Sequence, residues 1–414
     1  MYLGVGQRRC ITLVLSAFIA IFFCASYWQW SGGEQVRLTP SFHDADVAGA
    51  GKGGVLTKPG TTKELSPDEI VLAEYDEAPI REMCANSSWA DSRNVVVNCE
   101  SRVGGVGNVR QEFLVCVRQA IEIGASLIRP NIMLRSEGLI EYQNGPVHNM
   151  SYLFNLELFD ARLRSACPYM PIYNDLAEVQ LVGEVARVDL PRNLPEEQGV
   201  QLSFTEWARL NRQPEGKITF RTDTQRLAST ILSALLTRSS PAFLPYYGLA
   251  NNTFIGLHFR TEIDAVNVGY TSFEEQTAAY LSFVSATPIR AIYAASGNTT
   301  SLSLFAVEAA KLNPPATVVA KGDLLEGKDK QALEALTWDQ QALVDYLVLT
   351  KAARFAGVSD SSFSWGIAYA RQVVSAEAGT CQSVSGLEKG VQFRDELSTV
   401  FGRPRDWHIN KLWP

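Results

Sequence analysis

Two apolar periodicities alternate along this chain, and their alternation constrains its fold more than any other feature. Short runs rich in β-branched residues, typical of strands, are followed by stretches with apolar residues at helical spacing. The pattern occurs first between residues 94 and 185 and again between 253 and 374. A strand–helix–strand series predicts a parallel sheet covered by helices. Two series therefore predict an α/β protein with two Rossmann-like domains facing a cleft.

The boundaries of the two series follow from the same patterns. The first has strand patterns at 94–100, 126–130 and 178–185, and helical patterns at 107–124 and 153–166. The second, after a helical stretch at 224–238, has strand patterns at 253–260, 289–296, 316–322 and 354–359 and helical patterns at 272–285, 300–312, 339–353 and 361–374. A polar, proline-containing segment separates the series. We therefore place an N-terminal domain at 86–222 and a C-terminal domain at 223–414.

The N-terminus predicts a membrane anchor. Residues 11–30 carry no charge, and roughly 20 such residues span a bilayer as a helix. Arg8 and Arg9 precede this run, which predicts a cytoplasmic tail at 1–10 and a lumenal remainder. A cleavable signal peptide is the alternative, but the run is long for one and no convincing small-x-small cleavage site follows. We expect an uncleaved type II anchor followed by a flexible stem at 31–85, where small and polar residues dominate.

Glycosylation motifs and cysteines agree with a lumenal location in the Golgi or the endoplasmic reticulum. Asn-x-Ser/Thr sequons lie at Asn86, Asn149, Asn251 and Asn298. Of the seven cysteines, two lie in or beside the predicted anchor. The remaining five are an odd number, so at least one is free or pairs with another molecule, and the pairing stays open. None has Cys-x-x-Cys spacing, which argues against a zinc site.

Composition and two short motifs exclude other classes of function. The net charge of -7 and the pI of about 5.4 argue against a general nucleic-acid binder. The stem sequence GAGKGG resembles a phosphate loop, but Lys52 is followed by glycine and no strand precedes the motif. Asp44 and Asp46 could form a metal-binding pair, yet in a stem of this composition they read as solvated charge.

The first of three strand ends in the folded part is rich in glycine. Ligands of parallel sheets bind beyond the carboxyl ends of the strands. Gly104, Gly105 and Gly107 follow the first strand pattern, and backbone N–H groups in such a turn can hold an anion at a helix start. Asn108 adds a donor. An ordinary turn is the alternative, since the full G-x-G-x-x-G spacing is absent.

The second strand end is TFIGLHFRTEIDA, at 253–265. His258 and Arg260 alternate with apolar residues, so they share one face. The planar fork of an arginine matches a phosphate. The alternative is a structural ion pair of Arg260 with Glu262 or Asp264 and a core role for His258.

The third strand end carries hydroxyl groups. Ser359, Asp360, Ser361 and Ser362 follow a predicted strand and open a helix. Hydroxyls and free N–H groups at a helix start suit a phosphate, whereas ordinary N-capping is the alternative.

The ordered set of these strand ends resembles the GDP-fucose O-fucosyltransferase superfamily. The matching motifs are GGVGNVRQEF at 104–113, GLHFRTEID at 256–264 and VDYLVLTKAARFAGVSDSSFSWGIAYAR at 344–371. The resemblance extends in scattered blocks over residues 90 to 375. It implies a GT-B fold in which the C-terminal domain binds most of the nucleotide sugar.

The resemblance also implies roles for individual residues. Arg260 would bind the β-phosphate of GDP and stabilise charge on the departing diphosphate. His258 would orient nearby groups or contact the nucleotide, and Asp264 would face the guanine or ribose. The remaining implied contacts to the diphosphate and sugar come from Ser361, Ser362, Phe363, Gly107 and Asn108.

The function implied is inverting transfer of fucose from GDP-fucose to an acceptor hydroxyl, with protein O-fucosylation as the expected reaction. Members of the superfamily are typically metal-independent, so we expect no metal and no cofactor. Glu100, beside the glycine turn, is a candidate general base. The alternatives are a fucosyltransferase acting on glycans and a catalytically silent, lumenal GDP-sugar-binding protein.

Overall fold

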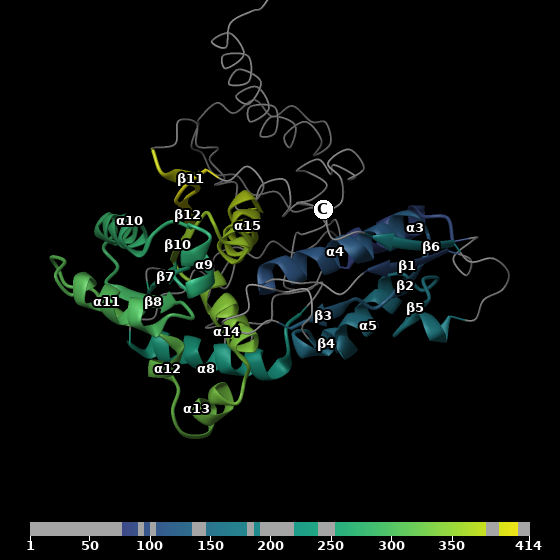
Figure 1. Ribbon diagram of the computed structural model, residues 1–414, viewed down its shortest axis with the longest axis horizontal. Helices are drawn as coiled ribbons and strands as arrows, with labels where there is room; N and C mark the ends of the chain where they lie inside the picture. The colour runs from purple at the N-terminus through teal and green to yellow at the C-terminus, as the bar shows by residue number, and fades with distance from the viewer. Residues whose placement is uncertain are drawn as a thin grey trace, which may run out of the picture. The chain divides into compact units, whose positions relative to one another are not determined.

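The computed structural model describes residues 77–89, 95–99, 105–134, 146–179, 186–190, 219–238, 253–377 and 389–404. All of them fall within the unit Leu65–Pro414, and Figure 1 shows their helices and strands. The predicted tail, the predicted anchor and most of the predicted stem lie outside the described residues. Within the described part, no helix is both long enough and apolar enough to cross a membrane.

The N-terminal half is built on a four-stranded parallel sheet. Its strands are β5 (Ile172–Tyr173), β2 (Ser126–Ile128), β1 (Val95–Cys99) and β6 (Ala186–Leu190), in that order. The helices α4 (Val106–Glu122) and α5 (Leu156–Ala166) lie where the sequence predicts them. A short hairpin of β3 (Asn131–Met133) and β4 (Val147–Asn149), followed by the 3-10 turn η1 (Met150–Tyr152), was not expected.

The strand predicted at 178–185 is wrong at its start, and residues 180–185 lie outside the described residues. Glu178 belongs to the 3-10 turn η2 (Leu176–Glu178), because the Asp175 carboxylate accepts hydrogen bonds from the N–H groups of Ala177 and Glu178. A strand that the sequence did not predict, β6 at 186–190, pairs in parallel with β1.

Folded structure also begins earlier than expected. Helix α3 (Ala78–Asn86) lies mostly within the stem predicted at 31–85. Pro79 starts this helix, and a disulfide joins Cys84 to Cys167 at the end of α5. Cys84 and Cys167 are both buried. The disulfide and this burial make α3 part of the folded domain, so the stem boundary at 85 is too late.

The C-terminal half contains a six-stranded sheet. Its strands are β11 (Val391–Arg394), β12 (Ser398–Phe401), β10 (Arg354–Val358), β7 (Ile255–His258), β8 (Ala291–Ala295) and β9 (Thr317–Val319), in that order. All neighbours are parallel except β11 and β12. From β7 the chain proceeds outward through β8 and β9, then crosses to β10 on the other side. The gap between β7 and β10 is therefore the topological switch point, where ligands of such sheets bind.

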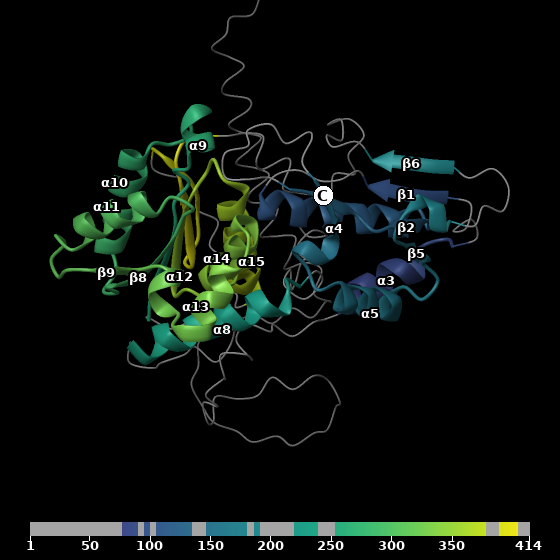
Figure 2. The same ribbon diagram turned by 60° about the horizontal axis from the view of Figure 1, so that its bottom comes forward.

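Helices cover both faces of this sheet (Figure 2). On one face, side chains of β7 pack with α10 (Phe273–Ser285) and α11 (Thr299–Ala309) in a separate apolar cluster. On the other face lie α8 (Thr222–Arg238), α14 (Trp338–Thr350) and α15 (Ser362–Glu377). Three short helices, α9 (Ile263–Asn267), α12 (Lys321–Leu324) and α13 (Gly327–Glu334), follow strands or connect helices and were not predicted.

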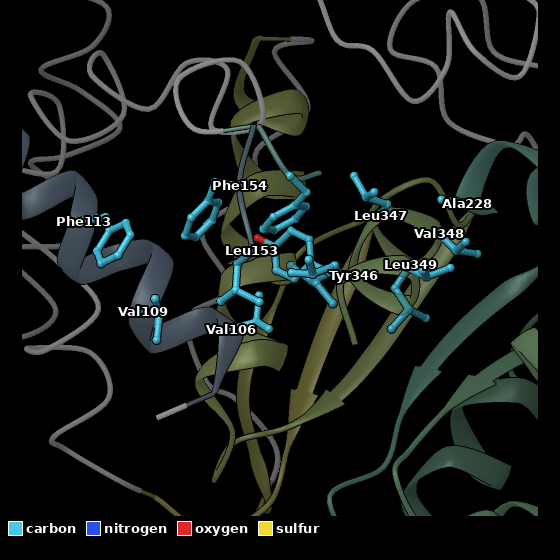
Figure 3. Close-up of a cluster of buried hydrophobic side chains, with 14 of the residues drawn as sticks. Val106, Val109, Phe113, Leu153, Phe154, Ala228, Tyr346, Leu347, Val348 and Leu349 are labelled. Atoms are coloured by element: carbon cyan, nitrogen blue, oxygen red, sulfur yellow. The ribbon is translucent and has the colours of Figure 1, made fainter. Parts of the chain in front are cut away.

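One hydrophobic core connects the two halves (Figure 3). Phe113 of α4 lies 5.3 Å from Phe154 between ring centroids, and Phe154 stacks on Phe220 at 5.8 Å. Phe220 then meets the edge of Tyr346 of α14 at 5.4 Å. Buried aromatic pairs of this kind contribute beyond the area that they remove from water. This packing holds the start of α4 near the C-terminal sheet.

A buried arginine and a buried aspartate stabilise the C-terminal edge of the fold. The Arg371 guanidinium, 1% exposed, donates hydrogen bonds to the backbone carbonyls of Thr350 and Ala352 at the end of α14 and to Ser398 Oγ. Asp395 Oδ1 accepts from the N–H of Ser398 at 2.6 Å, whereas its buried Oδ2 has no hydrogen-bond partner among the described residues. Burial raises the pKa of the Asp395 carboxyl to about 6.

This raised pKa makes stability depend on pH. Between the ordinary aspartate pKa of about 4 and about 6, the folded state binds more protons than the unfolded state, so the free energy of unfolding falls as pH rises. Asp395→Asn removes this titration and keeps an acceptor at Oδ1. We expect the variant to gain about 1–2 kcal/mol relative to the wild type between about pH 5 and about pH 7.5, measured by urea unfolding. An equal difference at both pH values would contradict the prediction.

Candidate active site

A cavity of about 1210 Å³ lies at the switch point of the C-terminal sheet. Its walls come from the segments that follow β7, β8, β9 and β10, and from the start of α4 in the N-terminal half. Seven of the nine predicted site residues line it: Asn108, His258, Arg260, Asp264, Ser361, Ser362 and Phe363. Glu100, the predicted general base, lies outside the described residues.

Gly107 has a different position from the one expected. It is buried beside the start of α15 rather than lining the cavity. A Cβ atom at Gly107 would lie 2.9 Å from the carbonyl carbon and oxygen of Ser362 and 3.0 Å from the N of Phe363. Real Cβ contacts to backbone are essentially never below 3.0 Å, so only glycine permits this approach. Gly107 thus brings the starts of α4 and α15 together at one edge of the cavity.

Arg260 sits between two carboxylates. Its Nη1 donates to Glu262 Oε2 at 2.5 Å and to Asp264 Oδ1 at 2.8 Å, and its Nη2 contacts Asp264 Oδ2. Both ion pairs that the sequence left as alternatives to phosphate binding are therefore present. They occupy the outer fork of the guanidinium, and Nε bonds to no described residue. The Nε edge of Arg260, whose side chain is 13% exposed, stays available to a ligand in the cavity.

Glu262 connects the ends of two neighbouring strands. Its Oε1 accepts from Ser296 Oγ at 3.1 Å and from the Gly297 N–H at 2.6 Å, beyond β8. Burial by itself would raise the pKa of the Glu262 carboxyl, but the charge and hydrogen bond of Arg260 outweigh burial and lower it. Glu262 therefore stays ionised and holds Arg260 in place. The sequence suggested no role for it beyond pairing.

His258 is a buried, neutral imidazole. Its Nδ1 lies 2.7 Å from Ser364 Oγ, and its ring packs on Phe363 at 4.5 Å between centroids. The Tyr280 hydroxyl donates to the His258 carbonyl at 2.6 Å. Burial lowers the pKa of His258 to about 4, with a further contribution from the Arg260 charge, although Glu262 opposes the shift. His258 is thus uncharged at neutral pH.

Ser361 and Ser362, after β10, line the cavity, whereas Ser359 is buried and donates its hydroxyl to the Arg403 carbonyl. Asp360 accepts from the N–H and hydroxyl of Thr271, at 2.8 and 2.5 Å, so its carboxylate is directed at another loop. The hydroxyls of Ser361 and Ser362 bond to no described residue and line the cavity. Ordinary side-chain capping of α15 is therefore not what these serines do within the described part. Hydroxyls at the start of a long helix suit an anion.

A second group of polar residues also lines the cavity and was missed from the sequence. Lys321, after β9, pairs with Asp345 Oδ2 at 2.6 Å, and the Tyr293 hydroxyl donates to Asp345 Oδ1 at 2.7 Å. Trp338 and Asp339, at the start of α14, also line it. The rule that ligands bind beyond strand ends could have identified Lys321, because it lies at the end of the strand predicted at 316–322.

Among the residues that the structure describes, no group of three or more His, Cys, Asp or Glu side chains lies close enough to hold a metal ion.

Comparisons of sequence and of structure give different results. No protein-family model matches the sequence, and no sequence among the curated proteins matches it. Solved structures do match. A crystal structure of POFUT1 in complex with GDP-fucose is 12% identical, covers 76% of this chain and 99% of that chain, and gives a TM-score of 0.43. The fucosyltransferase NodZ from Bradyrhizobium is 16% identical, with 68% and 92% covered and a TM-score of 0.38. These fucosyltransferases are remote neighbours of the chain.

Proposed function

We propose that this protein is a GT-B glycosyltransferase that moves fucose from GDP-fucose to an acceptor hydroxyl with inversion of the anomeric configuration. The observation that supports it most is that three kinds of group converge at one switch point: a partly buried arginine, two serine hydroxyls that do not cap the helix, and a residue from the other half. These groups are Arg260, Ser361 with Ser362, and Asn108, and all line the same cavity.

The diphosphate would bind at this switch point. The Nε edge of Arg260 offers N–H donors in a planar fork, which phosphate oxygens accept. Ser361, Ser362 and the N–H groups at the start of α15 add neutral donors and the positive end of the helix. Together they favour a ligand with two adjacent negative groups over a neutral sugar alone.

The nucleoside would extend toward the second group of polar residues. A guanine base carries N–H donors on its edge, which suit carboxylate acceptors such as Asp339. Trp338 lines the same cavity and offers an aromatic side chain to the base. The cavity exceeds the usual range of about 300–1,000 Å³ for small-molecule sites, which leaves room for an acceptor group.

The reaction then needs three functions. The acceptor oxygen attacks the anomeric carbon from the face opposite the leaving GDP, which inverts the configuration. Arg260 stabilises the charge that develops on the departing diphosphate, as a metal ion does in other transferases. A general base accepts the proton of the acceptor hydroxyl. Glu262 is a poor base because three donors hold its carboxylate, so Glu100 stays the candidate.

The test measures GDP release by the full-length protein. We expect turnover with GDP-fucose in preference to GDP-mannose and UDP-sugars, and no loss of rate when EDTA is added. Failure to bind any GDP-sugar would overturn the transferase proposal. Binding without turnover on protein or glycan acceptors would favour the silent GDP-sugar-binding protein, and loss of activity with EDTA would contradict metal-independence.

The choice of acceptor is a separate part of the proposal. We propose a protein hydroxyl as acceptor, and a glycan hydroxyl is the competing outcome. The two are distinguished by supplying folded protein domains and free oligosaccharides in parallel with radiolabelled GDP-fucose and asking which becomes labelled.

The compartment is proposed to be the lumen of the Golgi or the endoplasmic reticulum, with residues 11–30 as a type II anchor. The buried Cys84–Cys167 disulfide supports this proposal, because disulfides persist in oxidising compartments. A charge-free run of this length after paired arginines supports the orientation.

The sequons provide a prediction that depends on the structure. Asn86 and Asn149 are exposed, and the contacts of Asn149 use only its Oδ1. The Asn298 side chain instead caps α11, and its Nδ2, the atom that would carry a glycan, donates to the Thr261 carbonyl. Glycopeptide mapping after expression through a secretory pathway should therefore find glycans at Asn86 or Asn149 and none at Asn298. Glycan at Asn298 would contradict the structural argument, and no glycan anywhere would contradict the lumenal location.

A further inference from the structure

The contact between His258 and Ser364 bears on which imidazole nitrogen of His258 carries the proton. Ser364, in the first turn of α15, is fully buried, and its Oγ accepts a hydrogen bond from the Val358 N–H at 3.0 Å. The same oxygen lies 2.7 Å from His258 Nδ1. These are the two contacts that the Ser364 hydroxyl makes among the described residues.

A buried hydroxyl has one proton to donate, and leaving it without an acceptor is costly. Val358 N–H is a donor, so it cannot receive that proton. The remaining neighbour within hydrogen-bond distance is His258 Nδ1, which accepts only when it carries no proton itself. In the neutral imidazole the proton then resides on Nε2. The Nε2 atom bonds to no described residue, and His258 lines the cavity.

We propose that Ser364 is a positioning residue that holds His258 in the Nε2–H tautomer, so that Nε2–H donates to an oxygen of the diphosphate bound beside Arg260. The identity of that ligand rests on the proposed function, whereas the tautomer follows from the contacts of the protein alone. The ring is a neutral donor in this arrangement, and Arg260 supplies the charge.

The surrounding structure supports a fixed ring. Phe363 packs on one face of the imidazole, and the Tyr280 hydroxyl binds the His258 backbone. Gly357 lets Ser364 come this close, because a Cβ at Gly357 would lie 2.6 Å from Ser364 Oγ. The sequence therefore keeps a side chain out of the space that the Ser364 hydroxyl occupies.

The tautomer can be measured without any ligand. The chain has four histidines, so full-length protein labelled with 15N-histidine should give few ring signals, and His258→Gln identifies the one of interest. We expect long-range 1H–15N spectra to show a protonated Nε2 and an unprotonated Nδ1. Ser364→Ala should shift His258 toward the Nδ1–H form. A wild type with its proton on Nδ1, or no change in Ser364→Ala, would overturn the proposal.

The donor role is tested by GDP binding with a matched pair of variants. The amide nitrogen of glutamine can occupy the place of Nε2, whereas that of asparagine reaches only the place of Nδ1. We expect His258→Gln to stay within about threefold of wild-type affinity and His258→Asn to lose about tenfold or more. Ser364→Ala should weaken binding, and Ser364→Cys, which retains a weak donor, should recover part of the loss.

Equal losses in the glutamine and asparagine variants would overturn the donor role. Absence of GDP binding in the wild type would overturn the proposed function instead. The tautomer of His258 would still be tested by the spectrum of the ligand-free protein.

Discussion

Arg260→Ala should lower kcat/KM for fucosyl transfer by about 10³-fold, which is the largest single effect that we expect in this protein. The guanidinium carries the positive charge at the switch point, and the cavity around it limits screening by water. Arg260→Lys keeps a charge but has no planar fork, so it should recover only part of the loss. Initial rates of GDP release at several GDP-fucose concentrations provide the measurement.

The control must separate chemistry from folding, since removing Arg260 leaves Glu262 and Asp264 facing each other without their shared cation. Breaking a buried pair in this way costs several kcal/mol. Combining Arg260→Ala with Glu262→Gln relieves the charge, and we expect it to recover melting temperature without recovering activity. Arg226→Ala, which breaks the exposed pair with Asp329, serves as a surface control. Full activity in folded Arg260→Ala protein would rule out the proposed role.

Gly107→Ala should disturb both stability and activity. The new methyl group would meet backbone atoms of Ser362 and Phe363, which cannot move aside as a flexible side chain can. The starts of α4 and α15 must separate, at a cost of about 1–3 kcal/mol for overpacking. Asn108 and Ser362 line the cavity on these two helices, so their separation would misplace groups of the site. We therefore expect activity to fall by about tenfold or more.

Gly322→Ala is the matched control for melting temperature, because nothing lies within 4 Å of a Cβ at that position. It should unfold within about 0.5 kcal/mol of the wild type, because the new methyl group meets no neighbouring atom. If Gly107→Ala melts like Gly322→Ala and turns over like the wild type, the close approach of the two helices does not shape the site.

Most of the secondary structure could be predicted, and the reason is local. The strand β7 and the helices α4, α8, α10, α11 and α14 each carry a clear periodicity, and Ser272 and Thr337 mark helix starts through capping boxes. The predictions that failed concern short elements and strands whose position depends on pairing with another strand. Glu178 lies in a 3-10 turn rather than in a strand, and β6, β11 and β12 were not expected, because strand pairing selects among segments of similar composition.

The candidate site was predicted in part. The ends of β7 and β10 were identified because ligands bind beyond strand ends, and the side chains named there line one cavity. Glu262 and Lys321 were missed or left without a role, because their partners lie 34 and 24 residues away in the chain. Spacing along a sequence carries no information about such contacts.

The sequence by itself determined which segments alternate between strand and helix, and hence that Arg260 and Ser361 stand at strand ends. Periodicity and composition are properties of a few neighbouring residues, so they can be recognised without knowing which segments pack together. Only the tertiary structure decided that these ends meet at the switch point, that Gly107 permits two helix starts to touch, and that Ser364 directs the proton of His258. Those outcomes depend on distances between remote segments, which packing and hydrogen bonding set together when the chain folds.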